Sequence, residues 1–314
     1  MKIIQKTTLF IFLVFFSSSP AFAASRSWFE LPTGNGHGFQ IFDRQQNKIT
    51  TFLEHPYRYV APGSSTRTSG IGRRDLAHDI YFGMAVDESK TWLNAQSNIE
   101  YDNQTHMIHG SSTHGNIVAD TYYFAPWGYE GNAMVMLIKL TNNGSSDANV
   151  SAYGKANLKL GSGRPDPSSS GESINLSELN GNLYGVETGP GGGHAIYHPI
   201  GPVDLAKCGQ DSDLFNAPPA SVVNENCSGT DQVLLMGANT SLAPGESFWW
   251  GQAVLFVNDN PNEPQAADFK DDRSVDDILA QWSDFIGTQD AKALYESAHA
   301  EFESWRKNLN PSEL

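Results

Sequence analysis

The histidines of this chain are its candidates for acid–base catalysis and for metal binding. His106 and His109 lie three residues apart and His114 follows closely, a spacing that is compatible with a metal site. Residues three apart in a strand point to opposite faces, however, so these imidazoles converge only if a turn separates them. The other candidates for a general acid are dispersed along the sequence: His37, His78, His194 and His198. We therefore expect hydrogen-bonded histidines, with no metal and no cofactor.

Carboxylates are abundant, and glycoside cleavage is the chemistry that a pair of them performs. That reaction needs two carboxyl groups that face each other at about 5–9.5 Å. Nothing in the sequence places a pair of acids at that distance, and their abundance is typical of a charged surface. Examples are Glu54, Asp75, Asp79, Asp120 and Glu187. We expect no catalytic carboxylate among them.

Aromatic side chains offer a third kind of site, because the apolar face of a sugar ring stacks on indole and phenol rings. Trp127, Tyr129 and Trp249 are the candidate ligand-binding residues. Trp249 is followed by Trp250, and neighbours in a strand face opposite sides, so one of the two belongs to the core. The other is exposed or lies beneath the C-terminal helices. Burial in the core is the competing interpretation of all these rings.

The first 23 residues have the pattern of a secretion signal. Lys2 and Lys6 precede an apolar run over residues 8–16, and Ala21–Ala23 forms a small-x-small cleavage site. The run is too short to cross a hydrocarbon core of about 30 Å, and no later stretch is long and apolar enough. We predict cleavage after Ala23 and a secreted or periplasmic protein that has no membrane association after cleavage.

The net charge excludes two classes of partner. The chain has 20 basic and 35 acidic residues, a net charge of −15. Cleavage after Ala23 removes two lysines and no acid, which leaves 18 basic residues and a net charge of −17. Such a charge repels nucleic-acid phosphates and anionic membranes. We expect neither as a partner, and at most a neutral or cationic ligand.

The two cysteines are expected to form a disulfide. Cys208 and Cys227 lie 19 residues apart in a segment rich in Asn, Asp, Pro and Ser. An extracytoplasmic compartment permits the bond, and closing a loop of that length contributes about 3 kcal/mol in the chain-entropy account. The alternatives are two free thiols or a zinc site, and the second lacks nearby histidines or further cysteines.

Short apolar runs and apolar–polar alternation predict an antiparallel β domain over residues 24–272. Segments rich in Gly, Asn and Pro, such as residues 33–36, separate the runs as turns. Residues 161–173 and 189–193 are expected to be loops because they are rich in Gly and Pro. The predicted strands are Phe39–Asp43, Lys48–Leu53, Ile80–Ala85, Ile117–Phe124, Ala133–Thr141, Asn149–Leu160, Asn182–Glu187, His194–Ile200, Gln232–Asn239 and Phe248–Val257.

Residues 273–314 have the period of helices, and we assign them to a helical linker. Ser274 and Asp277 have the spacing of a capping box. Gly287 ends the first helix, and a second is expected from residue 288 or 290 to Lys307. The linker is either a cap on a self-contained protein or a connector to a further domain. The first helix carries one apolar face, formed by Val275, Ile278, Leu279, Trp282, Phe285 and Ile286.

The chain contains three segments, Trp28–Gly38, Arg74–Gly83 and Glu303–Lys307, that are similar to the amino-terminal β region of bacterial glucoamylase-like proteins of glycoside hydrolase family 15. In that family the region is a β-supersandwich with a galactose-mutarotase-like fold, and a helical linker joins it to a six-hairpin α/α barrel. The likeness covers nearly the whole mature chain. It implies a mainly β protein, an antiparallel β-supersandwich followed by C-terminal linker helices.

The resemblance also implies that catalysis belongs to another domain. In the family both catalytic glutamates lie in the barrel, and this sequence ends where the barrel would begin, so no position here inherits either role. The implied function is a secreted, non-catalytic accessory or sugar-associated domain of a glucoamylase-like glycoside hydrolase, with carbohydrate and an α/α-barrel catalytic partner as its expected partners. The alternatives are a mutarotase-like sugar epimerase, which would use a His acid and a Glu or Asp base, and a stand-alone carbohydrate-binding module.

Overall fold

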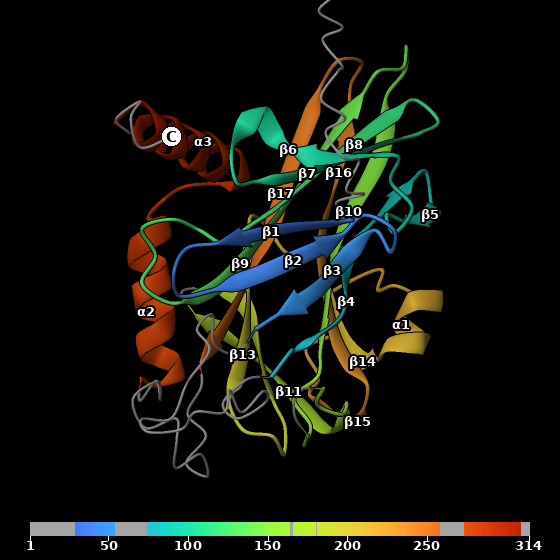
Figure 1. Cartoon of the computed structure of the whole chain (residues 1–314). Coiled ribbons are helices and arrows are strands. Elements are labelled where there is room, and N and C mark those ends of the chain that lie inside the picture. The colour runs from blue at the N-terminus through green and yellow to red at the C-terminus, as the bar shows by residue number, and fades with distance from the viewer. Residues whose placement is uncertain (1–28, 54–73, 164–165, 180, 258–272, 309–314) are drawn as a thin grey trace, which may run out of the picture.

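The computed structural model describes residues 29–53, 74–163, 166–179, 181–257 and 273–308. The predicted secretion signal and Glu54 lie outside these residues. Within the described part of the chain, two antiparallel sheets form a sandwich that three α-helices flank (Figure 1). The prediction of an antiparallel β-supersandwich followed by C-terminal helices is therefore confirmed.

The first sheet has eight strands among the described residues, in the order β1–β2–β3–β4–β10–β16–β14, with β5 paired to β4. Its interior strands β4, β10 and β16 are the longest, at ten or eleven residues each. The bounds of the strands are β1 Glu30–Gly34, β2 Phe39–Asp43, β3 Lys48–Phe52, β4 Ala77–Val86, β5 Ser89–Trp92, β10 Ala148–Leu158, β14 Leu205–Gln210 and β16 Gln232–Leu242.

The second sheet has nine strands in the described part of the chain, in the order β15–β11–β12–β13–β17–β9–β8–β7–β6. The bounds are β6 Asn98–Tyr101, β7 Ile108–His114, β8 Ile117–Phe124, β9 Asn132–Asn142, β11 Ser170–Leu179, β12 Asn182–Thr188, β13 His194–Ile200, β15 Cys227–Thr230 and β17 Ser247–Val257. A short 3-10 helix, Asp102–Gln104, follows β6.

One apolar core fills the space between the sheets, because alternate residues of each strand point inward. On β10 the inward set includes Ala152 and Ala156, whereas Tyr153 and Lys155 point away from the core between the sheets. Trp250 on β17 is fully buried in this core, so it is the tryptophan of the adjacent pair that belongs there. The outer faces of the two sheets can consequently pack against helices and loops.

The two C-terminal helices pack on the outer face of the nine-stranded sheet, and α1 (Asp211–Asn216) lies on the opposite side of the sandwich (Figure 1). Helix α2 spans Val275–Ile286, begins at Ser274 with the predicted capping box to Asp277, and ends at Gly287. Helix α3 spans Ala291–Asn308. Their buried side chains form a second apolar core with outward residues of β8, β9, β13 and β17. No helix in the described part of the chain combines the length and the apolar character that a membrane crossing requires.

The ten predicted strands all occur, with ends that differ from the prediction by at most three residues. Seven further strands in the described part of the chain were not predicted: β1, β5, β6, β7, β11, β14 and β15. Two of them overlap segments that were predicted to be turn or loop, since β1 includes Thr33 and Gly34 and β11 begins at Ser170. Most of these seven strands are short or rich in polar residues, so the alternation of apolar and polar residues along them is weak. Pairing with a neighbouring strand, rather than their own sequence, determines that they are strands.

Candidate functional site

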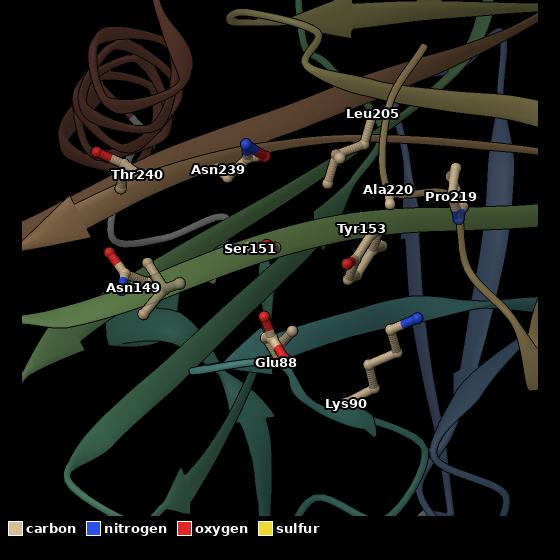
Figure 2. Close-up of a pocket in the computed structure, with 12 residues that line it drawn as sticks. Glu88, Lys90, Asn149, Ser151, Tyr153, Leu205, Pro219, Ala220, Asn239 and Thr240 are labelled. Atoms are coloured by element: carbon tan, nitrogen blue, oxygen red, sulfur yellow. The ribbon is translucent and has the colours of Figure 1, made fainter. Parts of the chain in front are cut away.

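A groove of about 730 Å³ lies on the outer face of the eight-stranded sheet (Figure 2). Five segments far apart in the sequence meet there: the β4–β5 hairpin, β10, β14, β16 and the loop after α1. Its polar lining consists of Glu88, Lys90, Asn149, Ser151, Asn239 and Thr240. Its apolar and aromatic lining includes Ala85, Val150, Tyr153, Leu205, Pro219 and Ala220. A site of this kind was not predicted from the sequence.

The strand register explains the hollow around Tyr153. This residue lies opposite Gly83 on β4 and opposite Gly237 on β16, so neither neighbouring strand places a side chain beside its ring. Both glycines are required by close approaches, because a Cβ on Gly237 would clash with the carbonyl oxygen of Ala152 and one on Gly83 would clash with the ring of Trp92. The groove is therefore built into the pairing of three interior strands.

A two-residue hairpin turn holds one end of the groove. Asp87 and Glu88 connect β4 to β5 with φ angles of 45° and 71°, a conformation that favours Asn and Gly. The backbone amide of Asp87 donates to the carbonyl oxygen of Asn149 at 2.9 Å, and the backbone amide of Asn149 donates to Asp87 Oδ1 at 3.1 Å. These bonds fix the turn, and with it Glu88, to β10.

The lining of the groove is suited to binding a polar ligand. Glu88 is its one carboxylate and Lys90 its one ammonium group, and the remaining polar side chains are amides and hydroxyls that both donate and accept hydrogen bonds. The lining therefore lacks the two opposed carboxylates that glycoside cleavage requires. Burial raises the pKa of Tyr153 above its ordinary value.

A buried lysine lies on the same outer face, next to the groove. Lys155 has a side chain that is 1% exposed, and its Nζ lies 2.7 Å from Asp211 Oδ1, 3.6 Å from Asp79 Oδ2 and 3.0 Å from the Tyr81 hydroxyl. Burial acts to lower the pKa of Lys155, but the hydrogen bonds to Asp211 and Tyr81 outweigh it and hold this pKa above its ordinary value. Three aromatic rings surround the ammonium group at 4.8–5.8 Å from their centroids, those of Tyr81, Trp92 and Phe215.

The predicted disulfide between Cys208 and Cys227 is present, and it links β14 of one sheet to β15 of the other. The bridged segment contains α1, whose Phe215 ring stacks on Trp92 at 5.3 Å between centroids. The indole Nε1 of Trp92 also donates to the carbonyl oxygen of Phe215 at 3.0 Å. Together with the Asp211 ion pair to Lys155, these contacts hold the segment that forms one wall of the groove.

Trp127 and Tyr129, two of the three predicted ligand-binding residues, contact the C-terminal helices rather than the groove. Trp127 is half-buried, and its ring lies 5.5 Å from Phe302 and 4.9 Å from Trp305 of α3. Tyr129 is 2% exposed and packs edge-on against Trp282 of α2 at 5.3 Å between centroids. Ligand binding by these two rings stays a prediction.

Trp249, the third predicted residue, lies on the outer face of the nine-stranded sheet, where it is half-buried. Its ring stacks on Tyr122 at 5.7 Å and lies 5.0 Å from Tyr295 of α3, with the ammonium group of Lys139 at 5.8 Å. Of the two positions that the sequence left open for Trp249, the one beside the terminal helices is therefore observed. Trp249 is on the opposite side of the sandwich from the groove.

The histidines of the predicted cluster have separate partners. His106 Nε2 lies 3.0 Å from the carbonyl oxygen of Ala125, and burial lowers the pKa of this histidine. His109 Nε2 lies 3.0 Å from Asp120 Oδ1, and His114 pairs with a serine hydroxyl two residues before it. Among the described residues, no group of three His, Cys, Asp or Glu side chains is arranged to hold a metal ion.

Two buried glutamates form the most strongly perturbed acidic site in the described part of the chain. Glu172 and Glu187 are both 0% exposed. Glu172 accepts from the amides of Leu160 at 3.0 Å and Gln232 at 3.1 Å, and Glu187 accepts from the hydroxyl of Tyr197. Burial raises the pKa of Glu172 to about 7, and burial together with the charge of Glu172 raises the pKa of Glu187 well above its ordinary value. Their burial makes these carboxyls inaccessible to a substrate.

This pair of glutamates predicts that stability falls as pH rises. The unfolded chain releases both protons near pH 4.5, whereas the folded chain retains that of Glu172 to about pH 7 and that of Glu187 to a pH well above 4.5. Between pH 5 and 7 we expect the free energy of unfolding to fall by on the order of 1 kcal/mol per pH unit. Glu187→Gln removes one of these protons and the repulsion on Glu172, so this variant should show less than half of the wild-type slope.

Denaturant unfolding at pH 5, 6, 7 and 8 measures the effect of Glu187→Gln. The matched control is Glu178→Gln on the neighbouring strand, where the glutamate is exposed and the slope should stay that of the wild type. A Glu187→Gln slope equal to that of the wild type would contradict the assignment of a buried, protonated carboxyl.

Two antiparallel sheets around one core, with two helices on the outer face of one sheet, define a β-supersandwich protein. No protein-family model and no curated protein matches the sequence. A bacterial glucoamylase in complex with acarbose has a similar structure, with a TM-score of 0.55 and 11% identity, over 88% of this chain and 36% of that one. This chain therefore shares the fold of a part of that glucoamylase and spans 36% of its length.

Two other solved structures match at lower TM-scores. A putative kojibiose phosphorylase from the human microbiome has a TM-score of 0.45 and 9% identity, over 81% of this chain and 35% of that one. A putative aldose 1-epimerase from Escherichia coli K12 has a TM-score of 0.41 and 8% identity, over 73% of this chain and 99% of that one.

Proposed function

We propose that this chain is a secreted accessory β domain of a glucoamylase-like glycoside hydrolase, non-catalytic by itself, which supports an α/α-barrel catalytic partner. The observation that carries the proposal is the packing of α2 and α3 on the outer face of the nine-stranded sheet. Helices fixed in this way can act as a rigid connector to a barrel. The fold shared with a part of a bacterial glucoamylase supports the same role.

The far part of α3 offers a surface for such a partner. Trp305 is 44% exposed, although its ring contacts both Trp127 and Phe302. His106 also packs against Trp127 and Phe302, so the exposed indole sits on a preformed aromatic cluster. Tryptophan is enriched at the energetically dominant positions of protein interfaces. The aromatic cluster of His106, Trp127, Phe302 and Trp305 is therefore the proposed contact with the barrel.

Turnover by the isolated chain is the first test of the proposal. Purified residues 24–314 are incubated with maltose and other α-glucosides, and we expect no release of glucose above that of the heat-unfolded protein. The physical reason is that the accessible groove holds one carboxylate and the strongly perturbed glutamates are buried. Glucose release that follows the folded chain through purification would overturn a non-catalytic role. Faster interconversion of sugar anomers in polarimetry would favour an epimerase instead.

Association with a barrel is the second part of the same test. The chain is co-expressed with an α/α barrel of glucoamylase type from the same genome, and the two should co-elute. Trp305→Ala is expected to weaken this complex by about tenfold or more. The matched control is Phe29→Ala, because Phe29 is another large apolar side chain, 41% exposed, that lies outside the aromatic cluster. Equal affinities for the two variants would contradict the proposed contact.

A further inference from the structure

The groove on the eight-stranded sheet has the composition of a binding site for a neutral ligand. Its charged lining residues, Glu88 and Lys90, balance each other, in a chain whose net charge is −15. A phosphate or another anion would meet one ammonium group within a strongly acidic protein, which disfavours its binding. A cation would meet one lining carboxylate beside that ammonium group, and the nearby carboxylates of Asp87 and Asp204 already accept from the backbone amides of Asn149 and Asn239. The remaining polar groups are uncharged, so a neutral ligand is the one that suits the groove.

The uncharged polar groups are those that recognise hydroxyl groups. The side-chain amides of Asn149 and Asn239 are exposed, and neither has a hydrogen-bond partner in the described part of the chain. Ser151 lies directly opposite Asn239 and next to Asn149 on the same face, and all three can both donate and accept. A ligand with several neighbouring hydroxyls satisfies such a row, because each hydroxyl also donates and accepts. Figure 2 shows these side chains along the groove, with Thr240 at the same end as Asn149 and with Pro219 at the other end.

The strands beneath the groove exclude an extended peptide added as a further strand. β10 is already paired with β4 and β16, and β16 is already paired with β10 and β14, so their backbone groups are satisfied. The paired strands beneath the groove therefore offer a ligand their side chains rather than their backbone groups. The volume of about 730 Å³ falls within the usual range of about 300–1,000 Å³ for small-molecule sites. Apolar residues such as Leu205 and Pro219 would contact the carbon-bound hydrogens of the ligand.

We infer that this groove binds a neutral oligosaccharide. The choice of a saccharide among neutral polyhydroxylated ligands rests on the proposed function, whereas the location and the neutral character rest on the groove itself. The site is separate from the aromatic cluster on α3, which belongs to the other side of the sandwich. The ligand is held between the amide row on β10 and β16 and the wall formed by the disulfide-bridged segment, which carries Pro219 and Ala220.

The test is a titration of the isolated chain, residues 24–314, by calorimetry and by saturation-transfer NMR. The probes are neutral maltohexaose, cellohexaose and xylohexaose, with a hexamer of galacturonic acid as the anionic comparison. At least one neutral hexamer should bind with a Kd of about 1 mM or tighter, and the anionic one at least about tenfold more weakly. Absence of binding by every neutral probe up to about 10 mM would overturn the inference, as would equal affinity for the anionic probe.

Two pairs of variants locate the site. Ala220→Trp fills the groove and should weaken binding by about tenfold or more, whereas Ala217→Trp, an exposed position in the same loop outside the lining, should leave it within about twofold. The double variant Asn149→Ala/Asn239→Ala should also lose affinity, and Asn182→Ala on the other sheet should not. Binding by the Ala220→Trp and the double variant at wild-type affinity would place the saccharide elsewhere and overturn the assignment. Failure of the barrel to co-elute affects only the proposed function, because this titration uses the chain alone.

Discussion

Replacing Lys155 by methionine is expected to lower the free energy of unfolding by about 3–5 kcal/mol. The methionine keeps the apolar stem but removes the ammonium group that lies 2.7 Å from Asp211. The side chain of Asp211 is only 12% exposed, so its carboxylate would stay largely desolvated without its partner. The contacts of the cation with the rings of Tyr81 and Trp92 would be lost as well. Denaturant unfolding at pH 7 measures the loss.

A more exposed lysine and a double-mutant cycle give the controls for Lys155→Met. Lys48 pairs with Asp79 where both side chains are more than 20% exposed, so Lys48→Met should cost less than about 1 kcal/mol. Lys155→Met/Asp211→Asn removes both buried charges and should be more stable than the sum of the two single losses predicts. A loss for Lys155→Met that is no larger than that for Lys48→Met would contradict the buried ion pair.

Lys155 also helps to position one wall of the groove. Lys155 holds α1 through Asp211, and α1 lies within the disulfide-bridged segment that carries Pro219 and Ala220. The Lys90 Nζ, 3.5 Å from the carbonyl oxygen of Pro218, adds a contact between that segment and the β4–β5 hairpin. A buried cation and a disulfide thus hold the wall of the groove from two sides. The groove is consequently a preformed feature of the fold, which reduces the cost of ordering when a ligand binds.

The elements that the sequence predicted are those governed by local rules. The capping box at Ser274 and the stop at Gly287 were predicted correctly because each depends on residues within one turn of the helix. The long interior strands were predicted because they contain long apolar runs, which are buried on both faces over most of their length. β5 was not, since its turn uses Asp87 and Glu88 at positive φ rather than the Asn and Gly that mark such a hairpin.

The sites were less predictable because they depend on contacts between distant segments. Lys155 contacts Tyr81, 74 residues away, and Asp211, 56 residues away, so nothing in its local sequence marks it as buried. The groove depends on the register that places Gly83 and Gly237 on either side of Tyr153. Among these contacts between distant segments, the disulfide was predicted, because two cysteines allow a single connectivity.

Replacing Trp282 by alanine is expected to lower the free energy of unfolding by about 3–5 kcal/mol, the usual cost of truncating a large buried aromatic side chain. Trp282 is 0% exposed, and it contacts Tyr129 at 5.3 Å and Phe285 at 5.5 Å between ring centroids. It is the largest side chain by which α2 covers the outer face of the nine-stranded sheet. Its loss should therefore also expose the backbone amides of α2 to hydrogen exchange.

The matched control for Trp282→Ala is Trp305→Ala on α3, which removes the same side chain from a position that is 44% exposed. That variant should lose only about 1 kcal/mol or less, because nearly half of this residue already faces solvent. Denaturant unfolding gives the two losses, and hydrogen exchange should locate the effect of Trp282→Ala in α2 and α3 rather than in the sheets. Similar losses for the two variants, or unchanged protection of α2 in Trp282→Ala, would contradict the view that this residue holds α2 to the sheet. If the expected difference is observed, one tryptophan fixes the C-terminal helices on the β domain while the other stays exposed for the proposed barrel partner.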